Sequence, residues 1–469
     1  MSKITEIFHQ AAEENANRVA FYSYEGHVVK KTYRELTHDI KVCINYFNEH
    51  NIRRGTKIFI FAPTSYKLTA FMIAAFRMGV QVMFIDINAK QETFKKLFRK
   101  FEPDYALVSN KTRFFRPFFR SIYQIKKTIN IDDIEGKATD VELPDIPDDE
   151  PALLTTTTGS TGMPKIVVRS HQDLFNQLEL IHNNLPKKDR PVVLSTSYIY
   201  LFAVLASGDE AVLPLVKLNQ PARLINRQLA HYANVPITMI FTTPVFCLKA
   251  NNIFKNLEQL YVGGASVNLD QAMKISDKFY KSQNYIVYGA TECNIMAHCG
   301  LKTYIKNLAT SYRSTLGKTF KGVSIRIDDD DNILVSCNAL IKGFINDKKE
   351  YDERKEEWYN TNDKGFIEND VLYYRGKYNY FVNYKDQRYY NHEIEQFITV
   401  SCPEVKKCAV VQKRKRIYVF LTEKTDEIKI SDKLHDRFGF KVKYRYIPQI
   451  PHDRRHHTKT DYKSLYKLA

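Results

Sequence analysis

The stretch Leu154–Val168, with the sequence LTTTTGSTGMPKIVV, gathers residue types that suit the binding of a polyphosphate. Its glycines, Gly159 and Gly162, let the backbone turn sharply and bring N–H groups close to an anion. Its hydroxyl groups donate hydrogen bonds to phosphate oxygens without adding charge, and Lys165 supplies a point charge. The spacing differs from a Walker A loop, because no Gly-Lys pair precedes a serine or threonine. A threonine-rich surface loop between two strands would have the same composition, so the stretch alone leaves both interpretations open.

The segment TTGSTGMPK resembles the phosphate loop of the acyl-adenylate-forming, AMP-binding enzymes, which include acyl-CoA synthetases, luciferases and the adenylation domains of peptide synthetases. Further motifs of this family follow in the expected order over nearly the whole chain. The resemblance implies that the loop holds the triphosphate of ATP and that Thr161 takes part in catalysis. The residues that it assigns to the nucleotide in this loop are Thr157, Thr158, Gly159, Ser160, Thr161, Gly162 and Lys165.

The segment Tyr288–Glu292, YGATE, resembles the second nucleotide motif of the same family. The resemblance implies that Tyr288 stacks on adenine and that Thr291, with Gly289 beside it, contacts the α-phosphate. It also implies that Glu292 holds Mg²⁺ and takes part in catalysis. Magnesium prefers oxygen ligands and keeps several waters, so one carboxylate near the phosphates is enough. The alternative is a strand end that carries an unrelated glutamate.

A second pair of glycines stands at the end of the apolar pattern Leu257–Gly264, LEQLYVGG. Ligands of open α/β sheets bind beyond the carboxyl ends of the strands. We therefore expect Gly263, Gly264 and Ala265 to lie at the same edge as Tyr288 and to contact the nucleotide.

The segment WYNTNDKG resembles the family's ribose-binding motif, which implies that Asp363 accepts hydrogen bonds from both ribose hydroxyls. A carboxylate can accept two hydrogen bonds from a diol. Asn362 stands where the family usually has glycine, and asparagine is the next best residue for a left-handed backbone.

The segment from Arg375 to Glu395 resembles the family's hinge but departs from it at three positions. Lys377, assigned to the nucleotide, replaces an arginine, Asn379 replaces the hinge aspartate, and Asp386 replaces a glycine on the path of the thiol. The final motif, HHTKTDYKSL, has Thr458 in place of a glycine. It places Lys459 at the catalytic lysine, which would neutralise charge that develops in the transition state. One lysine among many in a basic tail is the alternative.

The region Leu194–Gly208 aligns with the segment that lines the family's acyl pocket. Amino-acid-activating relatives have an aspartate there for the α-ammonium group, and this region has none. An unpaired ammonium is costly to bury, so the sequence favours an aliphatic or aromatic carboxylic acid, whose chain length the sequence does not give. Of these we expect a medium- or long-chain fatty acid. The expected reaction uses ATP, Mg²⁺ and coenzyme A to form acyl-AMP and then acyl-CoA. A carrier protein as the acceptor, or a degenerate member that only binds nucleotide, are the alternatives.

The elements that would position these residues alternate along the chain. Lys57–Ala62 and Val80–Ile85 read as buried strands, and Tyr66–Met78 and Phe94–Phe101 as helices. This alternation predicts a doubly wound α/β fold. We expect a large domain over residues 1–374, with two stacked sheets and a smaller β region, and a small α+β lid over residues 375–469.

Charge is concentrated in the predicted lid. The chain has a formal net charge of +17, and residues 375–469 hold 22 Lys/Arg and 11 Asp/Glu, so 22 − 11 = +11 falls in this part. Such a surface suits an acidic carrier protein, the phosphates of coenzyme A or an anionic membrane surface, and a solvated basic face is the ordinary alternative. No nucleic-acid-binding motif accompanies it, so we expect no nucleic acid as a partner.

Compartment and membrane contact can also be predicted. The seven scattered cysteines and the absence of a secretory h-region favour a cytoplasmic protein with reduced thiols. The uncharged run Pro191–Gly208 is diluted by polar residues, and it reads as a strand that leads into a buried helix rather than a transmembrane span.

Overall fold

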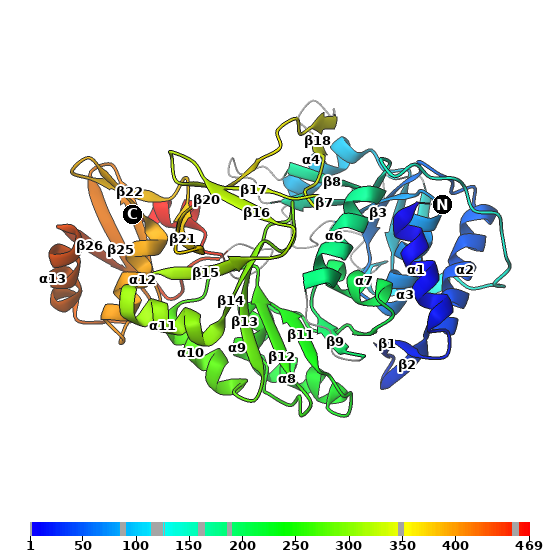
Figure 1. Cartoon of the computed structure of the whole chain (residues 1–469), viewed down its shortest axis with the longest axis horizontal. Coiled ribbons are helices and arrows are strands. Elements are labelled where there is room, and N and C mark those ends of the chain that lie inside the picture. Colours follow the sequence, from blue (N-terminus) through cyan, green and yellow to red (C-terminus); the bar gives the residue numbers. More distant parts are fainter. Residues whose placement is uncertain are drawn as a thin grey trace.

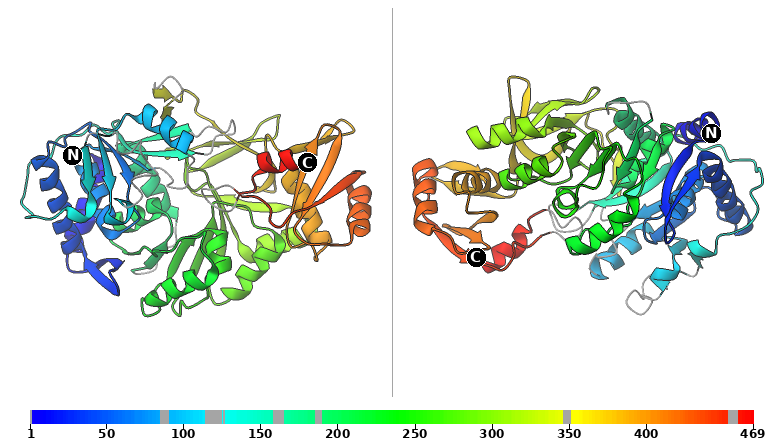
Figure 2. Two further views of the ribbon diagram at one scale, coloured as in Figure 1. Left: turned by 180° about the vertical axis from the view of Figure 1, so that it is seen from behind. Right: turned by 90° about the horizontal axis from the view of Figure 1, so that it is seen from below.

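The protein, seen in a computed structural model, is described here for residues 2–84, 91–113, 125, 127–157, 165–184, 190–345, 351–452 and 459–469. Within these residues two large sheets form one part of an elongated molecule, and a smaller C-terminal part lies at one end (Figure 1). Two further views agree that the C-terminal part and the N-terminal helices lie at opposite ends (Figure 2).

The first sheet has eight described strands and a parallel centre. Its strands are, in sheet order, β19 (Tyr351–Glu353), β18 (Gly343–Ile345), β8 (Lys165–Ser170), β7 (Pro151–Thr157), β4 (Gln81–Phe84), β3 (Lys57–Phe61), β5 (Tyr105–Val108) and β6 (Lys127–Asn130). β3 is buried on both faces, since Ile58 and Ile60 join one core while Phe59 and Phe61 join another. This alternation explains why the strand reads as a continuous apolar run.

The second sheet has thirteen described strands and changes from parallel to antiparallel after β13. Its strands are, in sheet order, β16 (Ser324–Ile327), β17 (Asn332–Ser336), β20 (Tyr359–Glu368), β21 (Val371–Lys377), β15 (Ser314–Thr319), β14 (Ala297–Gly300), β13 (Gln283–Tyr288), β12 (Gln259–Gly263), β11 (Met239–Thr242), β9 (Val192–Ser195), β10 (Glu210–Val212), β1 (Val19–Tyr24) and β2 (Val28–Thr32). The antiparallel strands form the predicted smaller β region, so it continues the second sheet.

Helices cover the faces of both sheets. One apolar core joins the two sheets to the helices α1 (Lys3–Glu14), α2 (Tyr33–Glu49), α3 (Tyr66–Arg77), α6 (His171–Asn184) and α7 (Tyr198–Ala206). A second core packs the other face of the thirteen-stranded sheet against α8 (Ala222–Leu229), the 3₁₀ turn η4 (Ala230–Tyr232), α9 (Pro244–Lys249), α10 (Leu269–Lys278) and α11 (Leu301–Ser311). A third packs the outer face of the first sheet against α4 (Gln91–Phe101), while α5 (Asn110–Arg113) and the 3₁₀ turn η3 (Ile131–Asp133) are short connections.

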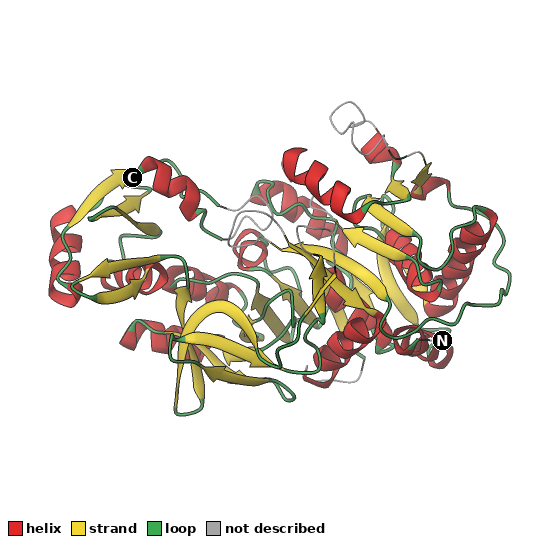
Figure 3. Ribbon diagram, turned by 90° about the horizontal axis from the view of Figure 1, so that it is seen from above, coloured by secondary structure: helices red, strands yellow, loops and turns green. Residues whose placement is uncertain are grey.

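The C-terminal part, which we call the lid, has its own apolar core. It contains the hairpin β22 (Phe381–Tyr384) and β23 (Gln387–Tyr390), and a sheet of β24 (Cys408–Lys413), β25 (Arg416–Leu421) and β26 (Val442–Tyr446). Its helices are α12 (Asn391–Ser401), α13 (Glu427–Phe438) and α14 (Tyr462–Leu468), at the left of the view in Figure 3.

The predicted fold class, a large doubly wound α/β domain with a small C-terminal α+β domain, is confirmed. The run Pro191–Gly208 forms β9 and α7, as expected. The domain boundary stays a prediction, and residue 375 lies inside β21, which continues to Lys377 in the large sheet. No helix in the described part of the chain is both long enough and apolar enough to span a bilayer.

Candidate functional site

The predicted phosphate loop connects two antiparallel strands. β7 and β8 pair along their length, and Thr157 lies opposite Lys165 at the point where the loop leaves the sheet. Residues 158–164, and with them Thr158, Gly159, Ser160, Thr161 and Gly162, lie outside the described residues. The Lys165 side chain is exposed, and its Nζ lies 5.5 Å from the centroid of the Phe344 ring. The loop is therefore anchored by a β-hairpin, and the contacts of its residues stay a prediction.

Two other predicted segments lie side by side at one sheet edge. β12 and β13 are parallel neighbours, with Gly263 opposite Val287, so Gly264, Ala265 and Tyr288 meet at the carboxyl ends of these strands. A Cβ on Gly263 would lie 3.0 Å from the Val287 carbonyl oxygen, and Gly264 has a φ of +85°. Both glycines are thus explained by local backbone geometry, and they leave an open edge beside Tyr288.

The ribose candidate, Asp363, is buried in β20 with 5% of its surface exposed. The Tyr288 hydroxyl donates a hydrogen bond of 2.8 Å to its Oδ2, and the Lys377 Nζ lies 2.5 Å from its Oδ1. Burial first, and then the charge of Asp363, raises the pKa of Tyr288 well above its usual value. The preceding Asn362 has a φ of +58°, so asparagine does adopt the left-handed conformation expected at this position. The structure thus brings two predicted site residues, Tyr288 and Lys377, together around the carboxylate of a third, Asp363.

The magnesium candidate, Glu292, follows Tyr288 after a tight turn. A Cβ on Gly289 would lie 1.7 Å from the Asn294 carbonyl oxygen, so only glycine allows the backbone to fold back on itself here. The Tyr359 hydroxyl donates to Glu292 Oε1 at 3.0 Å, and burial together with this carboxylate raises the pKa of Tyr359.

The donor set at Glu292 fits Mg²⁺. The described residues hold no group of three His, Cys, Asp or Glu side chains that could enclose a metal ion. Magnesium is commonly held by one or two carboxylates together with substrate phosphates and waters, and does not need a cage of protein ligands. A single carboxylate that a tyrosine hydroxyl orients therefore suits this ion when ATP is bound.

Sequence analysis missed a buried arginine that joins the two nucleotide segments. Arg169, at 4% exposure in β8, donates from Nη1 to Thr155 Oγ1 at 2.7 Å and from Nη2 to the Thr291 carbonyl oxygen at 2.5 Å. Its Nε donates to Gln177 Oε1 at 2.9 Å, and Gln177 Nε2 donates to the Glu292 carbonyl oxygen at 3.3 Å. The strand before the phosphate loop is thereby tied to the turn that carries Glu292. The one available signal was a charged residue inside the apolar run IVVRS, since a buried charge needs partners.

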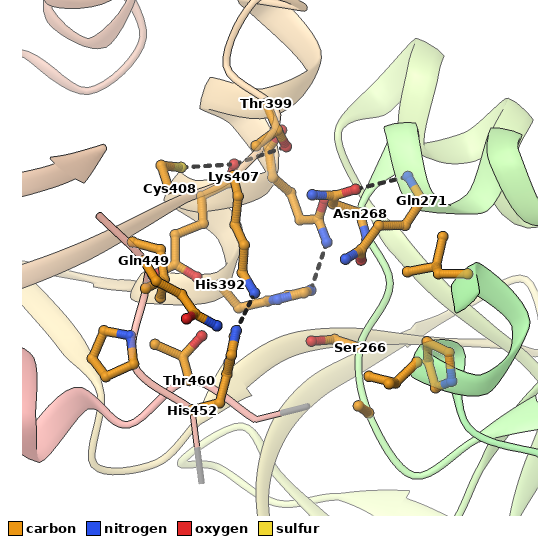
Figure 4. Close-up of a pocket in the computed structure, with 18 of the residues that line it drawn as sticks. Ser266, Asn268, Gln271, His392, Thr399, Lys407, Cys408, Gln449, His452 and Thr460 are labelled. Atoms are coloured by element: carbon orange, nitrogen blue, oxygen red, sulfur yellow. Dashed lines mark hydrogen bonds between the residues drawn. The ribbon is translucent and has the colours of Figure 1, made fainter. Parts of the chain in front are cut away.

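A cleft of about 690 Å³, lined by both polar and apolar residues, lies between the large domain and the lid (Figure 4). Ala265 and Ser266 line it from the large domain, His392 and Glu395 from α12, and Thr460 from the C-terminal segment. Burial lowers the pKa of His392 to about 4 and raises that of Glu395 to about 8. Because Ala265 belongs to the predicted nucleotide segment, the cleft begins at the nucleotide edge and continues under the lid.

The predicted catalytic lysine precedes a cleft residue. Lys459 is exposed and immediately precedes Thr460, which forms an isolated β-bridge with His452. Residues 453–458, including Thr458, lie outside the described residues. Lys459 therefore lies on the segment that closes one side of the cleft, and its catalytic role stays a prediction.

Two of the lid's departures from the family pattern, Asn379 and Asp386, lie in its hinge and hairpin. Lys385 and Asp386 form the two-residue turn of the β22–β23 hairpin, with φ of +47° and +61°, and Asp386 is exposed. Two positive φ values are typical of a hairpin turn that glycine, asparagine or aspartate adopts most easily. Asn379 lies in the short connection between β21 and β22. Asp386 is thus compatible with the turn, and it adds a charge at its tip.

The predicted acyl-binding region carries an aromatic stack. Tyr200 on α7 stacks on Phe241 of β11 with ring centroids 4.9 Å apart. The stack continues across the sheet, with centroid distances of 4.7 Å from Phe241 to Tyr261 and 5.1 Å from Tyr261 to Tyr285. These rings form an apolar wall beside the strands that end at the nucleotide edge.

Comparison with known proteins relates this chain to an enzyme family. The family described as "AMP-binding enzyme" matches residues 8–339, well over half of the chain. A D-alanine–D-alanyl carrier protein ligase of Streptococcus equi subsp. equi is 22% identical over 438 residues, which cover 86% of this chain and 82% of the ligase.

Two solved structures share the fold. The amide bond synthetase McbA from Marinactinospora thermotolerans has a TM-score of 0.84 at 14% identity, and the match covers 99% of both chains. The o-succinylbenzoate CoA synthetase of Bacillus subtilis, solved with its acyl-adenylate intermediate, has a TM-score of 0.79 at 18% identity and covers 98% of this chain and 97% of that one. The family uses ATP and Mg²⁺, which agrees with the donor set at Glu292. This protein belongs to the AMP-binding enzyme family and is an acyl-adenylate-forming enzyme.

Proposed function

We propose that this protein activates a carboxylic acid that lacks an α-ammonium group, a medium- or long-chain fatty acid, as acyl-AMP and transfers the acyl group to coenzyme A. The observation that carries the choice of acid is the composition of Leu194–Gly208, which contains no carboxylate. Tyr200 in this region begins an apolar stack of four rings. An apolar tail would pack against that wall, whereas a buried ammonium would find no counter-ion in this region.

In the first step the carboxylate attacks the α-phosphorus of ATP, a P–O bond forms, and pyrophosphate leaves. Asp363 would accept hydrogen bonds from the ribose, exchanging the Tyr288 hydroxyl for a sugar hydroxyl. Lys165 would contact the phosphates, and Lys459 would stabilise the charge that develops on the attacking and transferred oxygens. Glu292 would hold Mg²⁺, which neutralises the departing pyrophosphate. In the second step a thiolate attacks the acyl carbonyl, and AMP leaves.

A carrier protein is the second candidate acceptor, and two observations favour it. The Streptococcus equi relative is a carrier protein ligase, and it covers 86% of this chain. The segment 375–469 has 22 basic against 11 acidic residues, a charge that would complement an acidic carrier. The name of this relative gives D-alanine as its substrate, so D-alanine is the alternative acid to test against a fatty acid.

Matched acids test the proposal directly. Decanoic acid and 2-aminodecanoic acid share one tail and differ only in the ammonium group, as do propanoic acid and D-alanine. Acid-dependent pyrophosphate release is expected to favour decanoic acid over its amino counterpart by at least tenfold. Preference for D-alanine or 2-aminodecanoic acid would contradict the choice of acid.

The acceptor is tested separately. Coenzyme A and a phosphopantetheine-loaded carrier protein are each supplied to enzyme that holds preformed acyl-AMP. Thioester formation with coenzyme A at the higher kcat/KM supports the proposal. Transfer of the acyl group only to the carrier protein would contradict coenzyme A as the acceptor and favour the carrier protein instead.

A further inference from the structure

Two cysteines that are distant in sequence meet beside the candidate metal ligand. Cys293 Sγ lies 3.1 Å from Cys337 Sγ, against about 2.05 Å in a disulfide. Both are free thiols, and Cys337 is the only one of the seven cysteines that is not buried. The pair thus combines a partly exposed cysteine with a second, buried cysteine in contact with it.

Hydrogen bonds to backbone carbonyls already hold the segment that carries Cys293 next to the segment that carries Cys337. Cys293 directly follows Glu292 in the tight turn after β13, and Cys337 directly follows β17. The Ile341 N–H donates to the Glu292 carbonyl oxygen at 3.0 Å, and Gln177 Nε2 donates to both the Glu292 and the Ala339 carbonyl oxygens, at 3.3 Å and 3.1 Å. To form a disulfide, the two sulfurs therefore need to approach each other by only about 1 Å, and hydrogen bonds already hold the two segments side by side.

The two thiols differ in exposure. Cys337 is partly exposed, whereas Cys293 is buried. A thiolate is the nucleophile in thiol oxidation, and the more exposed Cys337 sulfur is the one that meets peroxide first.

We propose that Cys293 and Cys337 are a redox modification site, which peroxide converts to a disulfide that restrains the turn carrying Glu292. The Cys337 thiolate attacks a peroxide oxygen, the O–O bond breaks, and a sulfenic acid and water form. Cys293 then attacks the Cys337 sulfur, the S–O bond breaks, and a second water leaves. The sum is two thiols and one hydrogen peroxide giving one disulfide and two waters, and an external dithiol reverses it.

The functional consequence of the disulfide rests on the proposed function, whereas its formation does not. Pulling Cys293 toward β17 moves the backbone of Glu292, its neighbour in sequence. Displacement of a catalytic group by 1 Å can cost about a hundredfold in rate. We therefore expect the oxidised protein to release pyrophosphate at least about tenfold more slowly and to recover when the disulfide is reduced.

Mass analysis of the full-length protein tests the modification. Treatment with a few equivalents of hydrogen peroxide should lower the mass by 2 Da, and peptide mapping after thiol alkylation should join the Cys293 and Cys337 peptides. Cys337→Ser and Cys293→Ser should each prevent the 2 Da loss. Cys299→Ser, which removes a buried cysteine outside the pair, should not. Irreversible oxidation of Cys337 without a joined peptide, or the same response in Cys337→Ser as in wild type, would overturn the proposal.

A second measurement separates the modification from the enzyme assignment. The reduced wild type and the reduced Cys337→Ser variant should release pyrophosphate equally in the presence of the acid, and only the wild type should slow after peroxide. Inactivity of both reduced proteins would contradict the proposed function and leave the mass result to decide on the disulfide. A joined peptide with unchanged pyrophosphate release would contradict the regulatory part of the proposal.

Discussion

Replacing Arg169 by methionine should separate the phosphate-loop strand from the turn that carries Glu292. The arginine is 4% exposed and makes hydrogen bonds of 2.9, 2.7 and 2.5 Å to Gln177, Thr155 and the Thr291 carbonyl oxygen. Hydrogen bonds to charged groups contribute about 1.5–3 kcal/mol each. Removing the guanidinium also removes the cost of burying its charge, so we expect a net loss of about 3 kcal/mol in the free energy of unfolding.

Arg169→Met should lower the activity of the folded enzyme, beyond any loss that comes from a smaller folded fraction. Without Arg169 the Thr291 carbonyl loses its partner, and the turn can shift relative to the loop. We expect kcat/KM for ATP to fall about a hundredfold, which corresponds to about 2.7 kcal/mol, with KM for ATP raised as well as kcat lowered. Pyrophosphate release under saturating acid, with ATP and Mg²⁺ varied, measures kcat and KM for ATP separately.

Two variants control for simple destabilisation. Arg77→Met removes a partly buried arginine on α3 that lines a small cavity with Phe8 and Leu205, and it should leave KM for ATP unchanged. Arg169→Lys keeps the charge and one donor group and should recover part of the activity. A folded Arg169→Met protein with wild-type kcat and KM would refute the positioning role.

Further predictions concern the lid and the turn. Glu395→Gln should flatten the pH dependence of lid stability. Burial raises the pKa of Glu395 from 4.5 to about 8, so between these pH values the folded wild type binds a proton that the unfolded chain does not. The free energy of unfolding of the wild type therefore falls as pH rises through this window. Urea unfolding at pH 5 and pH 8.5 measures this loss, and an equal loss in the Gln variant would contradict it. Asp386→Gly, at the exposed hairpin tip, should speed acyl transfer to coenzyme A and leave adenylation unchanged; rapid-quench kinetics that show no acyl-AMP burst and no effect of the change would count against that. Gly289→Ala, whose Cβ would meet the Asn294 carbonyl oxygen at 1.7 Å, should abolish most adenylation, whereas Gly26→Ala at an exposed turn should cost only stability. Pyrophosphate release by both glycine variants tests this difference. An active Gly289→Ala enzyme would contradict the prediction and show that the turn tolerates movement.

Much of the fold could be predicted because its signals are local. β3 reads as a continuous apolar strand since both of its faces are buried, and Gly263 and Tyr288 could be placed at one edge because parallel neighbours end together. Asn362 was correctly expected to tolerate a left-handed backbone.

Contacts between distant segments could not be predicted. The ion pair between Asp363 and Lys377 depends on the register of β20 and β21, which shifts at an irregularity between Lys364 and Gly365. The sulfurs of Cys293 and Cys337 meet in the folded protein, where β17 pairs with β20 and Tyr359 of β20 contacts Glu292 in the turn after β13. Spacing along the chain carries no sign of either contact.

Acid-dependent exchange of labelled pyrophosphate into ATP tests the central claim most directly, because only a reversible adenylation step returns the label to ATP. With a fatty acid and Mg²⁺ the wild-type protein should incorporate label and yield an acyl-AMP of the expected mass. Lys459→Ala should lower the exchange about a hundredfold or more while still binding ATP, since contacts made in the transition state are worth roughly 2.7–4 kcal/mol. Bound ATP with no exchange for any acid in a panel of fatty, aryl and amino acids would contradict the account and leave a protein that only binds nucleotide.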